Sequence, residues 1–155
     1  MKKYFLWSVL ILLLAACGST AAPASAPQSP VASAPQSPVA PAGAVQVDIV
    51  YLNHPPLRGV LADLDKLLAT YGQRVHVTRY DFDTPQGEAF ATSKGLAGHT
   101  PLAIFVNGEQ QFTVSGHTIR FASFPQGQGT GMVADGEWTM QDLQTVLDGA
   151  TKGSS

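Results

Sequence analysis

The residues best placed to do chemistry form one short run, residues 53–57 with the sequence NHPPL, between an apolar stretch and an amphipathic one. A cysteine pair at a strand-to-helix junction of this kind is reactive, because the helix N-terminus stabilises a thiolate. This run instead holds an imidazole and an aliphatic side chain, and the single cysteine of the chain, Cys17, lies far upstream. Thiol–disulfide exchange needs an attacking thiolate and a second sulfur to resolve the mixed disulfide, so this junction does not support it.

A metal site is another interpretation, because the run contains His54 and a second histidine, His99, precedes another apolar stretch. Imidazole nitrogen binds copper and zinc, but a firm site takes three or four ligands. The candidates for a third ligand, Met132 and His117, are weak, and no H-x3-H or Cys/His spacing accompanies the histidines. The competing interpretation is that His54 caps a helix and that His99 is an exposed loop residue.

Other catalytic patterns find little support. Ser115 and Ser123 lack the G-x-S-x-G context of a nucleophile elbow. Asp81 and Asp83 follow a predicted strand and could form an acid pair, but we interpret them as turn and cap residues ahead of a helix. The run GQGTG at residues 127–131 has no strand before it and no helix close behind it, so it does not predict a phosphate-binding loop.

The chain begins with MKKYFLWSVLILLLAAC, in which Lys2 and Lys3 precede an apolar stretch over residues 4–14. The stretch is too short for an ordinary membrane-spanning helix and is typical of a secretory signal, which predicts a signal peptide over residues 1–17. Residues 14–17 (LAAC) resemble a bacterial lipobox. That resemblance implies that Cys17 becomes the acylated first residue of a lipoprotein, anchored on the extracytoplasmic side of a membrane. An ordinary signal peptide with a chance cysteine is the alternative.

Residues 18–43 are rich in Ala, Pro and Ser, and they contain the octet ASAPQSPV twice without change, at residues 24–31 and 32–39. An eight-residue unit of this composition cannot bury a core, so the segment is predicted to be a disordered tether. In polyproline geometry its 26 residues could extend to roughly 80 Å. The alternative is a ligand for a proline-recognition domain.

A single domain is predicted over residues 44–150, with a flexible tail at residues 151–155. The domain carries eleven acidic and six basic side chains, which leaves a charge of −5. Nucleic-acid affinity comes largely from neutralising phosphates with basic groups, so this domain is not predicted to bind nucleic acid. The same charge argues against the folded part lying on anionic lipid.

Hydrophobic periodicity predicts the elements that position residues 53–57. Residues 45–52 form a near-continuous apolar run in which Asp48 is the only charge, typical of a central strand covered on both faces. Residues 57–71 place apolar side chains at steps of three and four, which predicts an amphipathic helix. Asn53 is the predicted N-cap, the two prolines fall in the first turn, and Gly72 is the predicted C-cap.

Alternating strands and helices are predicted downstream, with strands over residues 74–82, 101–106 and 118–121 and a helix over residues 85–94. Asn107-Gly108 is the strongest short hairpin signal, and residues 110–115 are expected to pair back on the third strand. Thr139 and Asp142 resemble a capping box that opens a last helix.

A glycine-rich loop is predicted over residues 124–136, flanked by Phe121, Phe124 and Trp138. A long loop that carries aromatic side chains can serve as a docking surface for a peptide or a protein. The other interpretation is that these three aromatic side chains fill the core.

The order of the elements, with a proline opening the third strand, resembles the thioredoxin fold over residues 45–150. VDIVYLNHPPLRGVLADL resembles the family's strand–CxxC–helix passage, with HPPL on the four motif positions. DTPQGEAFATSKGLAGHTPLAIFVNG resembles the approach to the family's cis-proline, which would be Pro101, although the loop is one residue longer than usual. The resemblance implies a three-layer α/β/α sandwich with a mixed sheet of four to five strands and helices on both faces.

The same resemblance implies a binding groove in which the two histidines face each other, formed by Asn53, His54, Pro55, Pro56, Leu57, His99, Thr100 and Pro101. Because neither motif position carries sulfur, the fold does not bring the family's reaction with it. The first hypothesis is a redox-inactive binding or scaffold module without a cofactor, held on a membrane through Cys17, for an envelope protein or peptide. The second is a copper or zinc protein that uses His54 and His99, and the third is catalysis without cysteine at the same groove.

Overall fold

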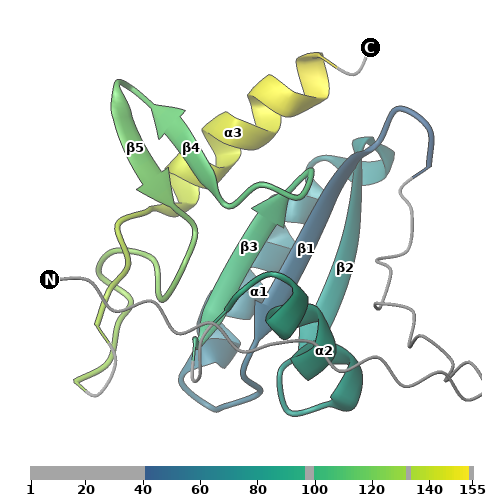
Figure 1. Cartoon of the computed structure of the whole chain (residues 1–155). Helices are drawn as coiled ribbons and strands as arrows, with labels where there is room; N and C mark the ends of the chain where they lie inside the picture. Colours follow the sequence, from purple (N-terminus) through teal and green to yellow (C-terminus); the bar gives the residue numbers. More distant parts are fainter. Residues whose placement is uncertain (1–40, 97–99, 132–133, 154–155) are drawn as a thin grey trace, which may run out of the picture. The chain divides into compact units, whose positions relative to one another are not determined.

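The apolar run that follows residue 44 forms β1 (Val45–Tyr51), the central strand of a three-stranded sheet. The computed structural model describes residues 41–96, 100–131 and 134–153, which belong to one unit. β1 pairs in parallel with β2 (Val75–Asp81) and antiparallel with β3 (Leu102–Val106), so the strand order is β2-β1-β3 (Figure 1). Every residue of β3 is buried, as expected of a strand that is covered on both faces.

Helices pack against both faces of this sheet (Figure 1). On one face, Val47 and Ile49 of β1 share a buried cluster with leucines of α1 (Leu57–Ala69) and α3 (Met140–Lys152). On the other face, Val50 shares a second cluster with residues of α2 (Pro85–Ser93). The predicted mixed α/β class is therefore confirmed. Among the described residues, no helix is both long and apolar enough to cross a lipid bilayer.

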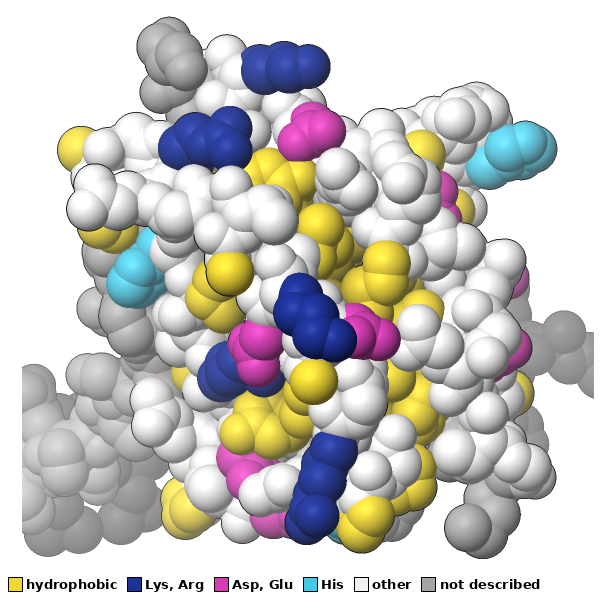
Figure 2. All heavy atoms as spheres, turned by 180° about the vertical axis from the view of Figure 1, so that it is seen from behind, with side chains coloured by type: hydrophobic (Ala, Val, Ile, Leu, Met, Phe, Trp, Pro, Cys, Tyr) yellow, Lys and Arg dark blue, Asp and Glu magenta, His cyan; other side chains and the backbone are white. Residues whose placement is uncertain are grey.

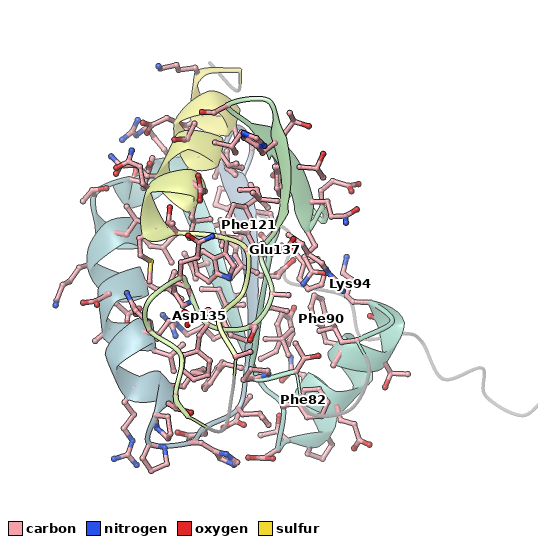
Figure 3. All side chains as sticks on the ribbon, turned by 90° about the vertical axis from the view of Figure 1, so that its left-hand side faces the viewer. Phe82, Phe90, Lys94, Phe121, Asp135 and Glu137 are labelled. Atoms are coloured by element: carbon pink, nitrogen blue, oxygen red, sulfur yellow. The ribbon has the colours of Figure 1, made fainter. Side chains whose placement is uncertain are left out.

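The α2 side of the sheet is held by aromatic stacking and one close backbone approach. The rings of Tyr80 and Phe90 stack with centroids 3.8 Å apart, and Lys94 Nζ lies 5.6 Å from the Phe90 centroid. Figure 3 labels Phe90 and Lys94, which lie near each other. A Cβ added to Gly87 would lie 1.8 Å from the carbonyl oxygen of Asp81. Glycine at this position therefore allows α2 to begin directly against the end of β2.

The ends of α1 differ from the prediction. The helix begins at Leu57, and its N-cap is Pro56 rather than Asn53, with no side-chain hydrogen bond at the cap. The proline pair explains the difference, because the main-chain carbonyls of the turn accept from the first free N–H groups of the helix. Leu57 N donates to His54 O at 3.0 Å, and Arg58 N donates to the next carbonyl at 3.2 Å.

At its other end α1 stops at Ala69 with Thr70 as the C-cap, and Tyr71 lies beyond the helix. Gly72 has a φ of +54° and begins the 3-10 helix η1 (Gly72–Arg74). The C-cap therefore lies at Thr70, two residues before the predicted position. Gly72 nevertheless adopts the left-handed conformation that favours glycine.

The other two helices begin at the predicted residues. Thr84 Oγ1 accepts from Gly87 N at 3.1 Å at the start of α2. At the start of α3, Thr139 Oγ1 accepts from Asp142 N while the Asp142 carboxylate accepts from Thr139 N, so the predicted capping box is confirmed. Local side-chain chemistry was sufficient to locate both helix starts.

The three aromatic side chains around the glycine-rich loop fill the core. Phe121, Phe124 and Trp138 are each at most 1% exposed, and the rings of Phe121 and Trp138 meet edge to face with centroids 5.5 Å apart. The interpretation of these residues as core is confirmed, and their interpretation as a docking surface is wrong. The loop itself closes through Gly136 N, which donates to Phe124 O at 2.6 Å.

The predicted third and fourth strands do not form an extended hairpin. Asn107 and Gly108 have the positive φ angles of a tight turn, but only the bridge between Val106 and Glu109 follows it. β4 (Gln111–Val114) pairs instead with β5 (His117–Arg120) in a separate two-stranded sheet, and the turn between them is Ser115-Gly116. The strands of the described residues therefore form a three-stranded and a two-stranded sheet, and one sheet of four to five strands is not confirmed.

Residues 121–123 pair with β3, whereas the sequence predicted that residues 110–115 would pair with it. Ile104 N donates to Phe121 O at 3.0 Å, and Ser123 N donates to Leu102 O at 2.9 Å. Burial explains the exchange, because Phe121 is fully buried whereas the residues after the turn include the polar pair Gln110-Gln111. A segment beside a fully buried strand needs apolar side chains.

Candidate functional site

Three loops meet at one end of the three-stranded sheet, because β1 and β2 end there and the antiparallel β3 begins there. Leu52 N donates to Pro101 O at 2.9 Å, which joins the loop after β1 to the residue before β3. Phe82 N donates to Tyr51 O at 2.8 Å, which joins the end of β1 to the loop after β2. We call residues 52–56, 82–84 and 100–101 together the loop cluster.

The NHPP segment is an exposed part of the loop cluster. His54 N donates to Leu52 O at 2.8 Å and His54 O accepts from Leu57 N, so the chain reverses tightly around the two prolines. Residues 53–56 are all exposed, whereas Leu57 is 2% exposed and contributes to the core. Leu57 is therefore not a groove residue, since its position on the inward stripe of α1 buries it.

The imidazole of His54 lies near Asp83, which the sequence pattern predicted to be a turn or cap residue rather than half of an acid pair. His54 Nε2 is 3.9 Å from Asp83 Oδ2, and the two side chains are 62% and 59% exposed. Asp81 has the predicted turn role, because its carboxylate accepts from Asp83 N at 3.0 Å and its carbonyl accepts from Thr84 N. The proximity of His54 and Asp83 follows from the parallel pairing of β1 and β2, which no local motif signals.

The partner histidine of the proposed metal site, His99, lies outside the described residues, as does Met132. His117 is the first residue of β5, in the two-stranded sheet rather than in the loop cluster. Within the described ranges, no three His, Cys, Asp or Glu side chains are grouped closely enough to hold a metal ion. His54 and Asp83 thus supply two neighbouring ligand groups, fewer than a firm site takes.

The start of β3 differs from the cis-proline that the resemblance implied. None of the described peptide bonds is cis, so the Thr100–Pro101 bond is trans, the form that X–Pro bonds favour by about 0.5–1 kcal/mol. Thr100 and Pro101 are both half-buried and lie beside Leu52 through the hydrogen bond to the Pro101 carbonyl. The expected closeness of the two segments is therefore present with a trans bond.

Two polar features lie away from the loop cluster. Asp48, in the middle of β1, is only 3% exposed, and its carboxylate accepts from Gln46 Nε2 at 2.6 Å. In the glycine-rich loop, the Asp135 carboxylate accepts from the backbone N–H groups of Gly127 and Gly129, and Figure 3 shows its place. These two amides are engaged by a side chain of the same loop, so they do not form an open anion site.

On the face that Figure 2 shows, charges of both signs are mixed. Figure 2 shows the molecule from behind, where lysine and arginine side chains alternate with acidic ones around exposed apolar groups. Arg79 forms an ion pair with Asp65, and Lys66 lies 3.0 Å from Asp63. The visible face therefore has no basic stripe of the kind that binds a phosphate backbone. Comparison of the chain with protein-family models, with curated proteins and with solved structures finds no match.

Proposed function

We propose that the chain is a lipoprotein of a bacterial envelope, tethered to a membrane through Cys17, whose thioredoxin-like domain is redox-inactive and binds a protein or peptide at the loop cluster. The arrangement of elements supports the thioredoxin-like part of this proposal. A βαβ unit of β1, α1 and β2 is followed by α2 and an antiparallel β3, with helices on both faces of the sheet. The helix that follows β1 begins at the position where the family has its CxxC motif.

The hydrogen bond of 2.9 Å between Leu52 N and Pro101 O carries the proposal. It places the NHPP turn next to the start of β3, so that two segments about fifty residues apart in the sequence border one surface. The turn has two prolines and an exposed imidazole, and the described domain has no sulfur with which to exchange disulfides. Such a surface is suited to recognition rather than to redox chemistry.

The loop cluster also has physical properties that favour binding. Pro55 and Pro56 are exposed and conformationally restricted, so their contact with a partner costs little conformational entropy. Asp83 adds an exposed carboxylate beside them, and the domain as a whole carries −5. A partner with a neutral or basic segment suits this charge, because charge complementarity steers association and disfavours acidic partners.

Site-specific photo-crosslinking in intact cells tests the proposal. A photoreactive residue at Asn53 reports on the loop cluster, and the same residue at Gln73, in η1 at the opposite end of β2, is the matched control. We expect position 53 to give a discrete adduct with an envelope protein or peptide other than this chain, and position 73 not to give that adduct. Equal adducts from both positions, or none from position 53, would contradict it, as would reduction of insulin by the domain with dithiothreitol above the rate of buffer.

A second candidate function, binding of copper or zinc through His54 and His99, is favoured by the 3.9 Å separation of His54 Nε2 and Asp83 Oδ2. A carboxylate next to an imidazole would give such a site a third ligand. A ligand that binds the native state raises the midpoint of thermal unfolding. The test therefore compares the midpoint of the chain with copper, with zinc and without metal. We expect a rise in the wild-type chain and in His117→Ala, and none in His54→Ala. Equal midpoints with and without both metals exclude this candidate.

A further inference from the structure

Among the described residues, the outer edge of β2 has no partner strand. β1 lies on one side of β2 over all seven residues, and no described segment pairs with its other side (Figure 1). The opposite edge of the sheet differs, because residues 121–123 and the turn after Val106 cover β3. An open edge strand is a template for pairing with another strand, and proteins usually block it with prolines, bulges or free charges.

The backbone groups on this edge can be assigned from one hydrogen bond. Phe82 N donates to Tyr51 O, so Phe82 turns its backbone groups toward β1. The N–H and C=O groups of successive residues in a strand point to alternate sides. His76, Thr78 and Tyr80 therefore also face β1, whereas the backbone groups of residues 75, 77, 79 and 81 face outward.

Two of the outward groups are already used at the ends of the strand. Val75 N donates to Gly72 O, and Asp81 O accepts from Thr84 N at 3.0 Å. Both groups of Val77 and of Arg79 remain directed to the edge, together with the carbonyl of Val75 and the N–H of Asp81. This set is symmetric about Thr78, which is the pattern that an antiparallel partner of identical sequence requires.

We propose that a second copy of this chain pairs with β2, antiparallel and in register about Thr78, to join the two three-stranded sheets into one. In that register Val77 of each copy lies opposite Arg79 of the other copy. Each of these two residue pairs exchanges two backbone hydrogen bonds, which makes four. Val75 and Asp81 add two more at the ends. The six bonds use every outward group of β2 that has no backbone partner among the described residues.

Charge selects this register over its neighbours. Centred on Thr78, all seven residues of each strand overlap, and each arginine faces a valine. A register centred on Arg79 would place the two arginines opposite each other, which is destabilising. A register centred on Val77 leaves the last residues of the strand without a partner. Thr78 then faces its own copy, a pair that is favourable in antiparallel sheets.

The side chains around β2 leave the edge open to a partner. Arg79 forms an ion pair with Asp65 of α1, so its side chain is anchored to the helix beside the strand. Between α1 and β2 lies a hollow of about 300 Å³ that is lined by both of these residues and by Val77. The segment Pro41–Ala44 lies near the Val75 end of β2, and a larger hollow of about 790 Å³ separates the two. This end is away from the four proposed hydrogen bonds of Val77 and Arg79.

Disulfide trapping in membranes that hold the full chain tests the proposal. In the proposed register the two Thr78 Cα atoms lie about 4.5 Å apart, within the range that a disulfide spans. The two His76 Cα atoms lie about 14 Å apart, four residues along the strand, so His76→Cys is the matched control. The wild-type chain, whose only cysteine is Cys17, gives the background.

We expect mild oxidation to convert Thr78→Cys to a covalent dimer at least about tenfold more than His76→Cys, in line with these separations. Equal dimer from the two variants, or a Thr78→Cys product of another mass, would overturn the proposal. A charge test complements it, because Val77→Lys faces Arg79 of the second copy with a like charge and Val77→Glu faces it with an opposite one. In the Thr78→Cys background, Val77→Lys is expected to reduce the dimer and Val77→Glu to increase it, and the reverse order would contradict the register.

Amide exchange provides a readout that needs no added cysteine. The outward amides of Val77 and Arg79 are expected to gain protection as the concentration of the chain rises. The amides of His76 and Thr78, which donate toward β1, are expected to be protected at every concentration. If the exchange rates of the Val77 and Arg79 amides do not change up to the highest concentration of the chain that the membrane holds, the proposed pairing is contradicted.

Discussion

The hydroxyl of Tyr71, just beyond α1, donates to Asp148 Oδ1 of α3 at 2.8 Å and also lies 3.1 Å from the Gln144 carbonyl. This contact links the two helices that cover one face of the sheet. We expect Tyr71→Phe to lower the free energy of unfolding by about 1–2 kcal/mol, because the carboxylate loses its donor. Urea unfolding measures the change, with Tyr51→Phe as the control, since the Tyr51 hydroxyl has no hydrogen-bond partner among the described residues. Equal losses in the two variants would contradict this role.

Because of the same hydroxyl, we expect the free energy of unfolding to fall at alkaline pH. Burial, the hydrogen bond from Tyr71 to Asp148 and the charge of that carboxylate raise the pKa of Tyr71 from 10.0 to about 12, against a smaller opposing effect of Arg74. The folded chain holds this proton more tightly than the unfolded chain, so the stabilisation is complete below pH 10 and is lost as the pH rises through 12. The stability difference between wild type and Tyr71→Phe should therefore shrink over that range. A constant difference would show that the proton is not linked to folding.

Gly87 is predicted to be intolerant of any side chain. A Cβ at this position would lie 1.8 Å from the Asp81 carbonyl oxygen, so Gly87→Ala must displace α2 from the end of β2. We expect a loss of about 1–3 kcal/mol or more, as for other overpacked sites. Gly149→Ala is the matched control, because a Cβ there meets nothing within 4 Å and alanine favours the helix by about 0.5–1 kcal/mol. Thermal melting should thus move the two variants in opposite directions.

The capping box of α3 is predicted to contribute measurably to stability. Thr139→Ala removes the acceptor of the Asp142 N–H and the donor to the Asp142 carboxylate, which should cost about 1 kcal/mol. Thr145→Ala, an exposed position in the same helix whose hydroxyl bonds only to the Gln141 carbonyl, should be neutral or slightly stabilising. Chemical unfolding of both variants checks the pair. Equal midpoints for Thr139→Ala and wild type would show that the box is dispensable.

Acylation of Cys17 is predicted from the leader sequence. In a bacterial host, a clickable fatty acid should label the wild-type chain and Ser19→Ala but not Cys17→Ala, since the thiol is the site of attachment. Mass spectrometry should also find that the wild-type chain starts at Cys17 and that Cys17→Ala retains the leader. Labelling of Cys17→Ala, or an unlabelled wild-type chain, would disprove lipid attachment at Cys17, and neither result bears on the fold.

The sequence predicted elements well where a few neighbouring residues decide the outcome. The inward stripe of α1 and the starts of α2 and α3 depend on side chains within about one helical turn of each other, so they appear in the local pattern. The Asn107-Gly108 turn was found for the same reason. The cap of α1 was misplaced because two consecutive prolines remove the donors that Asn53 would have accepted.

Pairing over long distances could not be predicted in this way. Only the folded chain shows that residues 121–123 lie beside β3, because that choice depends on which segment buries its side chains against Ile104 rather than on a turn signal. The contact between His54 and Asp83 likewise requires β1 and β2 to lie in parallel register. The same register decides which backbone groups of β2 face outward.

The sequence by itself determined the repeated octet, the acidic charge and the lack of cysteine at the strand-to-helix junction, and it predicted the mixed α/β class. The leader with Cys17 and the role of the repeat as a tether stay predictions from the sequence. Composition, periodicity and motif residues are sufficient for these, because each is a property of neighbouring residues. The tertiary structure alone decided between the two interpretations of Trp138, brought His54 next to Asp83 and left one edge of β2 without a partner strand among the described residues. Contacts between distant residues depend on the packing of the whole domain, in which each segment competes for the same buried space.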